Sequence, residues 1–470
     1  MPPSIPGPAS PLLELAIELD RTDSRPLAAQ LADALRLAAT RGQLRSGDRL
    51  PSTRALARHL AVSRTVTAAA YEQLHAEGWT AGRHGSGTYV TAAPPGAEGV
   101  SRGGEVHEEE SSSFQGTLLT PGAPWAEGID RAAWRRAWRA AGDNAPATLP
   151  HRAGVPEYRA AVVEHLLRHR GLVVEGPAEN SVLATGGTTS ALAELAASVL
   201  PRGAAVAVEE PGYQRAVEAL HASGVEVVPA PVDCSGVLVD SIPEHVSALY
   251  CSPAHQYPIG GRLPAQRRIA LVERARAAGW LIVEDDYDGE LRYDVAPLPV
   301  LASMAPDVVV HLGTTSKILT PTLGVGWLLA PERVSRAILE YRELTGTRPA
   351  PAGQLLLTEL ARNGDLGRHL RRLRRELSGR RELLVTALTE AGIETAGDRA
   401  GAHVLVPLDD ADSERGALTR LRARGVLADG LSRHHRFEQQ WYGVALGYAA
   451  CSREELRATL PTLVRELGGG

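Results

Sequence analysis

Residues 308–329, VVVHLGTTSKILTPTLGVGWLL, contain the one lysine of this 470-residue chain, and every other one of its 50 Lys and Arg residues is arginine. A lysine amine can lose its proton and attack a carbonyl group, whereas a guanidinium stays protonated. Residues 308–312 are typical of a short buried strand, so Lys317 is expected just beyond its carboxyl end, where open α/β sheets bind ligands. Lys317 is therefore interpreted as a Schiff-base lysine. The alternative is that Lys317 has no special role and was retained by chance in a sequence that otherwise uses arginine.

Strand-like and helix-like runs alternate from about residue 180 onward. Strands are expected at residues 206–208, 225–228, 246–250, 280–283 and 308–312, with helices at about 188–200, 212–223 and 264–278. This alternation predicts an α/β domain with a mostly parallel, doubly wound sheet. Polar motifs follow four of the strands: EEPGY (209–213), SPAHQY (252–257), EDDY (284–287) and TTSK (314–317). Because the carboxyl ends of parallel strands meet at one edge, these motifs are expected to converge there.

The converging residues suit a pyridoxal phosphate site. Asp285 can pair with the pyridine nitrogen and keep it protonated, which makes the ring an electron sink. Tyr287 can hydrogen-bond near the ring oxygen. Gly187 and Thr188 open a helix, so backbone N–H groups and a hydroxyl can hold a phosphate there. Three further candidates are Tyr213, which would cover the ring or reach the phosphate, and Thr314 and Ser316, which would add hydroxyl donors.

Charge, cysteine and histidine spacing and the lack of long apolar runs indicate which partners and which cellular compartment to expect. The net charge is −5, so any contact with nucleic acid must come from a local basic patch. Cys234, Cys251 and Cys451 are isolated in the sequence, which favours a reducing compartment. No signal peptide or apolar run of membrane-spanning length is evident, so a cytoplasmic protein without a membrane partner is expected. Adjacent histidines at 434–435 lack further ligands at metal-site spacing, and no metal is predicted.

The N-terminal part has the pattern of a helix-turn-helix. Leucines recur at helical spacing after residue 25, a second helix follows a cap at Ser52, and Ser63 caps a third helix. The free face of the third helix would begin with Arg64, Thr65 and Thr67, which suit phosphate and base contacts. Residues 79–90 resemble a hairpin wing. By spacing alone, a three-helix packing motif without DNA binding is equally compatible.

Residues 25–90 resemble the winged helix of the GntR superfamily, through GDRLPSTRALARHLAVSR (47–64) and GSGTYV (85–90). The resemblance implies binding to double-stranded operator DNA. An N-terminal arm (1–24) precedes this domain and a Pro-, Gly- and Glu-rich linker (91–117) follows it. The implied DNA contacts are Arg54, Ser63, Arg64, Thr65, Thr67 and Arg83.

Residues 118–470 resemble a fold-type I aminotransferase, a large α/β domain followed by a smaller α+β subdomain. The matching stretches are LATGGTTSAL, VEEPGYQRA, SPAHQYPIGG, VEDDYDGELRY and GTTSKIL. Together with the winged helix, the chain resembles the MocR family of bacterial transcription regulators, which includes GabR and PdxR. The resemblance implies pyridoxal 5'-phosphate on Lys317, His255 among the cofactor-binding residues, and a head-to-tail homodimer. A small effector would change how the two winged helices sit on DNA.

Two positions depart from the family pattern. Gly324 stands where an arginine usually binds the cofactor phosphate, and Ala445 stands where an arginine usually binds an amino-acid carboxylate. Arg215 remains as a possible anion site for the effector. The loss at Gly324 would weaken cofactor binding unless another group compensates. The loss at Ala445 favours a regulator that senses the vitamer, as in PdxR, over one that senses an amino acid, and no catalytic residue is predicted. The alternatives are an active aminotransferase with a DNA-binding head, and a decayed domain kept for dimerisation.

Overall fold

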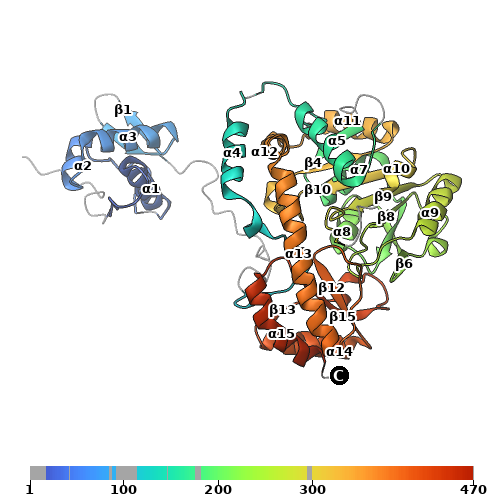
Figure 1. The fold of residues 1–470 in the computed structure, drawn as a ribbon. Helices are drawn as coiled ribbons and strands as arrows, with labels where there is room; N and C mark the ends of the chain where they lie inside the picture. Colours follow the sequence, from blue (N-terminus) through green and yellow to red (C-terminus); the bar gives the residue numbers. More distant parts are fainter. Residues whose placement is uncertain are drawn as a thin grey trace, which may run out of the picture. The chain divides into compact units, whose positions relative to one another are not determined.

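The computed structural model describes residues 17–41, 43–83, 87–91, 114–145, 147–174, 181–293 and 299–468. The chain divides into two compact units, residues 1–109 and 110–470, and Figure 1 labels many of their helices and strands. Among the described residues, no helix combines the length and apolar character needed to cross a membrane.

The first unit is a winged helix-turn-helix. It contains helices α1 (Leu27–Thr40), α2 (Thr53–His59) and α3 (Arg64–Ala76), and the antiparallel hairpin of β1 (Thr80–Arg83) with β2 (Gly87–Val90). Ser52 and Ser63 begin α2 and α3, because each hydroxyl accepts a hydrogen bond from a backbone N–H three residues ahead. These two caps are where the sequence predicts them.

A small apolar core holds the three helices together. Leu31, Leu56 and Leu74, one from each helix, are almost completely buried in it. Ile17 and Leu19, from the predicted N-terminal arm, also pack against this core. The described end of the arm is therefore part of the winged-helix unit.

The second unit contains an eight-stranded sheet of order β4-β11-β10-β9-β8-β5-β6-β7. Neighbours from β10 through β9, β8 and β5 to β6 are parallel, whereas β11 and β7 pair antiparallel with their neighbours. The predicted mostly parallel sheet is confirmed. The strands are β4 (Val182–Thr185), β5 (Ala205–Glu210), β6 (Glu226–Asp233), β7 (Gly236–Val237), β8 (Ala248–Cys251), β9 (Leu281–Asp286), β10 (Val309–Thr314) and β11 (Gly326–Leu329).

Helices cover both faces of this sheet (Figure 1). One face packs on α7 (Thr188–Val199), α8 (Gln214–Ala222) and α11 (Glu332–Thr345). The other packs on α5 (Pro156–Arg170), α9 (Ala265–Ala278) and α12 (Pro351–Arg362), beside which lies α4 (Arg131–Gly142). Strands buried on both faces read as continuous apolar runs, which is why the sequence shows them clearly.

The C-terminal part forms a smaller subdomain. Its sheet has the order β12-β15-β14, from β12 (His403–Leu408), β15 (Tyr442–Gly447) and β14 (Asp429–Gly430). The long helix α13 (Asp365–Glu390), with α14 (Ala411–Ala423) and α15 (Arg453–Leu467), completes it. A two-stranded sheet joins β3 (Thr117–Leu118) to β13 (Val426–Leu427). The short elements are α10 (Leu301–Met304), η3 (Ala126–Gly128), η4 (Val239–Ser241), η5 (Pro321–Leu323) and η6 (Leu431–His434).

Several strands run further than the sequence analysis predicts. β5 extends through Glu210, β9 through Asp286 and β10 through Thr314, although the apolar runs end earlier. Backbone pairing continues after the apolar side chains stop, because the N–H and C=O groups there are still buried. Thr117 was expected at the end of the linker, but it is already paired in β3.

Candidate functional site

Lys317 lies in the turn after β10, as predicted. The turn is fixed because the N–H of Thr315 donates to the Val325 carbonyl at 3.0 Å and the next apolar residues, Ile318 and Leu319, are buried. The Lys317 Nζ atom donates a hydrogen bond to the carbonyl of Gly122 at 2.7 Å. Burial lowers the pKa of the Lys317 amine, against the opposing charges of nearby carboxylates. A lowered pKa favours the neutral, nucleophilic amine.

Asp285 lies near the end of β9, in the strand next to the one that precedes Lys317. The Tyr250 hydroxyl donates to its Oδ2, while its Oδ1 is buried and has no hydrogen-bond partner in the described part of the chain. Burial raises the pKa of Asp285 to about 7, and the positive charge of Lys317 opposes this rise. A buried acceptor without a partner is costly, so this oxygen is suited to receive a donor from a bound group.

A cradle of small and hydroxyl-bearing residues lies where α7 begins. Gly187 precedes the helix with φ of +122°, and its N–H donates to Thr185 Oγ1 at 3.3 Å. The neighbouring turn brings up Thr314, whose Oγ1 lies 2.9 Å from Ser316 Oγ and 3.7 Å from an ideal Cβ at Gly187. Thr188 is the first residue of the helix, so free N–H groups and hydroxyls converge there, as an anion requires.

Tyr213 closes this cradle from the loop after β5. Its hydroxyl lies 3.4 Å from Thr189 Oγ1, within hydrogen-bonding distance of the first turn of α7. Arg215 is exposed in the first turn of α8. Burial lowers the pKa of Lys317, and the positive charge of Arg215 lowers it further. The predicted effector residue is therefore close enough for its charge to act on the lysine.

Tyr287 and His255 form a pair beside Asp285. The Tyr287 hydroxyl lies 3.1 Å from His255 Nδ1, which is also 2.8 Å from Asp288 Oδ2. His255 is 2% exposed and packs against Gly401, where an added Cβ would meet its ring at 2.1 Å. The structure therefore places His255 as a support for Tyr287, and direct contact of His255 with a cofactor stays a prediction.

The two departures from the family pattern have plain structural settings. Gly324 ends η5 with φ of +59°, and a Cβ there would meet nothing within 4 Å. Ala445 is fully buried in β15, paired with Leu405 on one side and Asp429 on the other. Asp429 is in turn paired with Arg433 at 2.9 Å. A ligand carboxylate near Ala445 would therefore lie close to the Asp429 carboxylate, and the nearby cation, Arg433, is already paired with Asp429.

The residues at this site have the chemical groups that pyridoxal phosphate requires. Lys317 supplies a buried amine, Asp285 supplies a free buried acceptor, and the start of α7 supplies a phosphate cradle. When bound, the group contributes an aldehyde and an electron-withdrawing ring. Lys317, Asp285, Tyr287, Gly187, Thr188, Tyr213, Thr314 and Ser316 would hold it.

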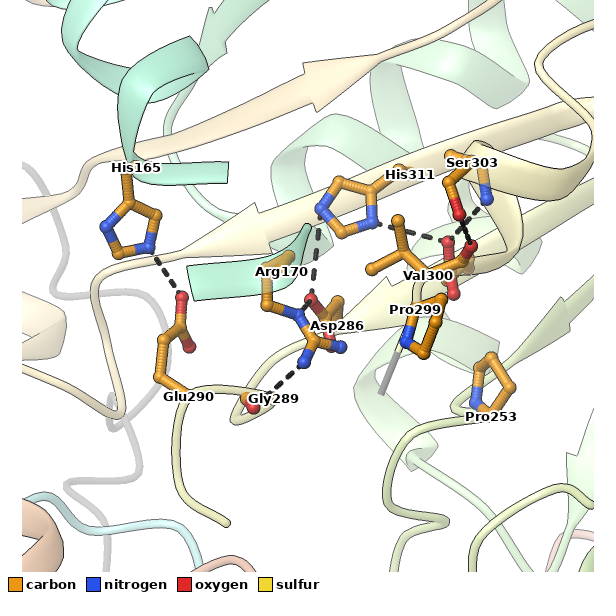
Figure 2. Close-up of polar contacts among 12 residues, drawn as sticks. His165, Arg170, Pro253, Asp286, Gly289, Glu290, Pro299, Val300, Ser303 and His311 are labelled. Atoms are coloured by element: carbon orange, nitrogen blue, oxygen red, sulfur yellow. Dashed lines mark hydrogen bonds and ion pairs between the residues drawn. The ribbon is translucent and has the colours of Figure 1, made fainter. Parts of the chain in front are cut away.

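Behind Asp285, on the opposite face of the sheet, lies a layer of buried charges that Figure 2 shows. Adjacent strand residues point to opposite faces, so Glu284 and Asp286 face away from Asp285. Arg170, at the end of α5, contacts Asp286 with two hydrogen bonds of 2.6 and 2.7 Å and also donates to the Gly289 carbonyl. Its side chain is 1% exposed.

The same layer continues along β10 and α5 (Figure 2). His311 Nδ1 lies 3.4 Å from Glu284, and His165 Nε2 lies 2.7 Å from Glu290. Burial opposes a charge on His311, but its hydrogen bond with Glu284 and the charge of Asp286 raise its pKa. Arg170, His311 and His165 thus each contact a buried carboxylate, which fixes the strand ends that carry Asp285 and Lys317.

The DNA-binding candidates occupy the start of α3 and of α2. Arg54, Ser63, Arg64 and Thr65 are exposed there, as a groove-facing surface requires. Thr67 is different: it is fully buried, and its hydroxyl donates to the Thr53 carbonyl at 2.9 Å. The prediction that Thr67 contacts DNA is therefore wrong, because the residue joins α3 to α2. The side chain of Arg83 lies outside the described residues.

Comparison with known proteins identifies both units. Residues 27–90 match the family of bacterial regulatory proteins named gntR, and residues 126–463 match aminotransferase class I and II. The chain is 33% identical to the HTH-type pyridoxine biosynthesis transcriptional regulator PdxR of Corynebacterium glutamicum, over 96% of this chain and 98% of that protein. It is 29% identical to the probable rhizopine catabolism regulatory protein MocR of Rhizobium meliloti, over 95% and 94%. The chain belongs to the MocR family.

The solved structures support the fold of the larger unit. An archaeal alanine:glyoxylate aminotransferase superposes with a TM-score of 0.69 at 23% identity, covering 76% of this chain and 91% of that one. This likeness shows the fold alone. The MocR-family protein described here is a DNA-binding transcription regulator with a fold-type I aminotransferase-like unit, and this fold and these relatives imply pyridoxal 5'-phosphate as its cofactor.

Proposed function

We propose that this regulator holds pyridoxal 5'-phosphate on Lys317 and that occupancy of this site changes its affinity for operator DNA. Two buried groups carry the proposal: the Lys317 amine, and the Oδ1 atom of Asp285, which has no hydrogen-bond partner among the described residues. Both groups lie at the carboxyl edge of the parallel sheet, beside the cradle at the start of α7. The cofactor would then be the ligand that the regulator senses, and it would not serve a catalytic cycle.

The effector is the vitamer itself and not an amino acid. The setting of Ala445 supports this part of the proposal, because Asp429 is its neighbour in β14 and Arg433 is paired with that carboxylate. A zwitterionic amino acid would bring its carboxylate toward a like charge. Arg215 stays the proposed anion contact for a ligand that approaches from the side of α8.

The working assembly is a head-to-tail homodimer in the cytoplasm, with two winged helices on two half-sites of one operator. The exposed start of α3 would enter the major groove in each half-site, with Arg54, Ser63, Arg64, Thr65 and Arg83 as contacts. Operator binding would weaken steeply with salt, since phosphate contacts release counterions.

Titration of the purified protein with pyridoxal 5'-phosphate, followed by visible absorbance, tests the site. A saturable new band is expected for the wild type, a weaker one for Asp285→Asn and none for Lys317→Ala. Borohydride reduction should then add the cofactor mass to the peptide containing residue 317 alone, since the chain has no other lysine. Wild-type protein that shows no band at saturating cofactor would refute the proposed site.

An active aminotransferase is the competing function. It predicts that amino acids bleach the wild-type band stoichiometrically and that a 2-oxo acid restores it over repeated cycles. Our proposal predicts no sustained turnover.

A further inference from the structure

The segment that joins the linker to the larger unit is anchored in the C-terminal subdomain. β3 pairs in parallel with β13, so that the N–H of Thr117 donates to the Gly425 carbonyl at 2.9 Å. The N–H of Leu119 donates to the Leu427 carbonyl at 2.7 Å, and Leu119 is fully buried. The chain cannot slide through this region without breaking these bonds.

Beyond Leu119 the segment passes the end of β15 at very close range. The N–H of Gly447 donates to the Leu119 carbonyl at 2.6 Å. An added Cβ at Gly447 would lie 2.5 Å from the Thr120 carbonyl oxygen and 3.0 Å from Pro121 Cα. Only glycine fits at this crossing, so the segment and the end of β15 are tightly packed.

The tip of the segment contacts the lysine. Gly122 adopts φ of +94°, which turns its carbonyl toward the Lys317 Nζ atom at 2.7 Å. An ideal Cβ at Gly122 would lie 3.1 Å from that same nitrogen. The Lys317 amine therefore rests against the backbone of the segment that leads back, through residues 91–113, to the winged helix. The DNA-binding unit has no other covalent connection to the larger unit.

We infer that Gly122 is a positioning residue for Lys317 and that residues 117–122 report the state of the lysine to the linker. The inference rests on the proposed cofactor site. A lysine nitrogen that is bonded covalently to the cofactor cannot at the same time donate this hydrogen bond to the Gly122 carbonyl. Loading therefore removes one bond from the tip of the segment and loosens its attachment to β13. The loss of a hydrogen bond from an amine to a carbonyl corresponds to about a twofold to tenfold change in such an equilibrium.

Hydrogen exchange followed by mass spectrometry on the full-length protein tests this coupling. The reporters are the amides of Thr117 and Leu119, measured with and without pyridoxal 5'-phosphate. In the wild type, the cofactor should speed their exchange by about twofold to tenfold. Gly122→Ala should exchange quickly without cofactor, because its Cβ displaces the lysine amine, and should respond little to cofactor. Lys317→Ala should behave in the same way.

Gly171→Ala is the matched control. Gly171 also has a positive φ, +64°, at the end of α5, but an added Cβ there meets nothing within 4 Å. It should therefore lose stability from backbone strain and keep the wild-type response. A wild type whose absorbance band forms while exchange at Thr117 and Leu119 stays unchanged would overturn the coupling alone. A wild type without the band would overturn the proposed site as well.

Discussion

Replacement of Gly324 by arginine should tighten the binding of pyridoxal 5'-phosphate. Gly324 lies between the turn of Lys317 and β11, and β11 begins against the phosphate cradle: an added Cβ at Gly326 would lie 2.9 Å from Gly187 Cα. A side chain at position 324 would start in open space, because its Cβ has no neighbour within 4 Å. An arginine there therefore begins without a clash at its Cβ, and we expect its guanidinium to reach the cradle.

The substitution has two separate effects, one on cofactor affinity and one on stability. A hydrogen bond from a guanidinium to a phosphate stabilises the complex by about 1.5 to 3 kcal/mol. The left-handed backbone at Gly324, φ +59°, costs a residue with a Cβ about 1 kcal/mol. This strain is present with and without the cofactor, so it lowers stability and not affinity, and the expected gain in affinity is about tenfold to about a hundredfold.

The assay is an absorbance titration with pyridoxal 5'-phosphate, in parallel with the matched variant Gly324→Ala. Alanine carries the same backbone strain without the guanidinium, so it should lower stability and leave cofactor affinity near that of the wild type. Equal affinities for Gly324→Arg and Gly324→Ala would refute the placement of the phosphate beside this turn.

Three further predictions follow from the buried charges and the exposed start of α3. Arg170→Leu leaves Asp286 buried without its guanidinium partner and should lower the free energy of unfolding by about 3 to 5 kcal/mol in urea. Arg276→Leu, at an exposed pair, should leave that free energy nearly unchanged. Because burial raises the pKa of Asp285 from 3.8 to about 7, the native apoprotein binds a proton more tightly than the unfolded chain. Its free energy of unfolding should therefore fall, relative to Asp285→Asn, as pH rises from about 4 to about 7, and parallel pH profiles would contradict this. Arg64→Ala should weaken DNA binding and reduce the slope of log affinity against log salt by about one; an unchanged slope would remove Arg64 from the phosphate contacts.

Much of the larger unit could be predicted from the sequence, for a physical reason. Strands buried on both faces are continuous apolar runs, and residues that follow them must gather at one sheet edge. Lys317, Asp285 and Gly187 were identified by this placement, and the structure brings them to that edge. The roles of these residues stay predictions until a cofactor titration is made.

Contacts between distant segments could not be predicted in this way. Gly122 reaches Lys317 across 195 positions of sequence, through a backbone carbonyl that every residue possesses. Arg170 is one of many arginines, and only the fold shows that it ends α5 against Asp286. A signal did exist for that layer, because Glu284 and Asp286 are charged residues inside a strand, where a charge requires a partner.

For Thr67, the sequence predicts a DNA contact at a residue that is buried. Its neighbours Arg64 and Thr65 are exposed, and its hydroxyl suits a DNA contact as well as theirs. Thr67 precedes Ala70, Tyr71 and Leu74 by three, four and seven residues, so it lies on the buried face of α3, where it donates to the Thr53 carbonyl. The helical spacing to these residues was therefore the signal that separates Thr67 from the exposed Thr65.

The most direct test of the account is the affinity of the full-length protein for a duplex that it selects from a random-sequence pool, measured with and without pyridoxal 5'-phosphate. We predict that the cofactor changes the wild-type affinity and leaves Lys317→Ala unaffected, while a panel of amino acids changes neither. A wild type that carries the absorbance band but binds DNA equally with and without the cofactor, or that responds to an amino acid instead, would contradict the proposed function.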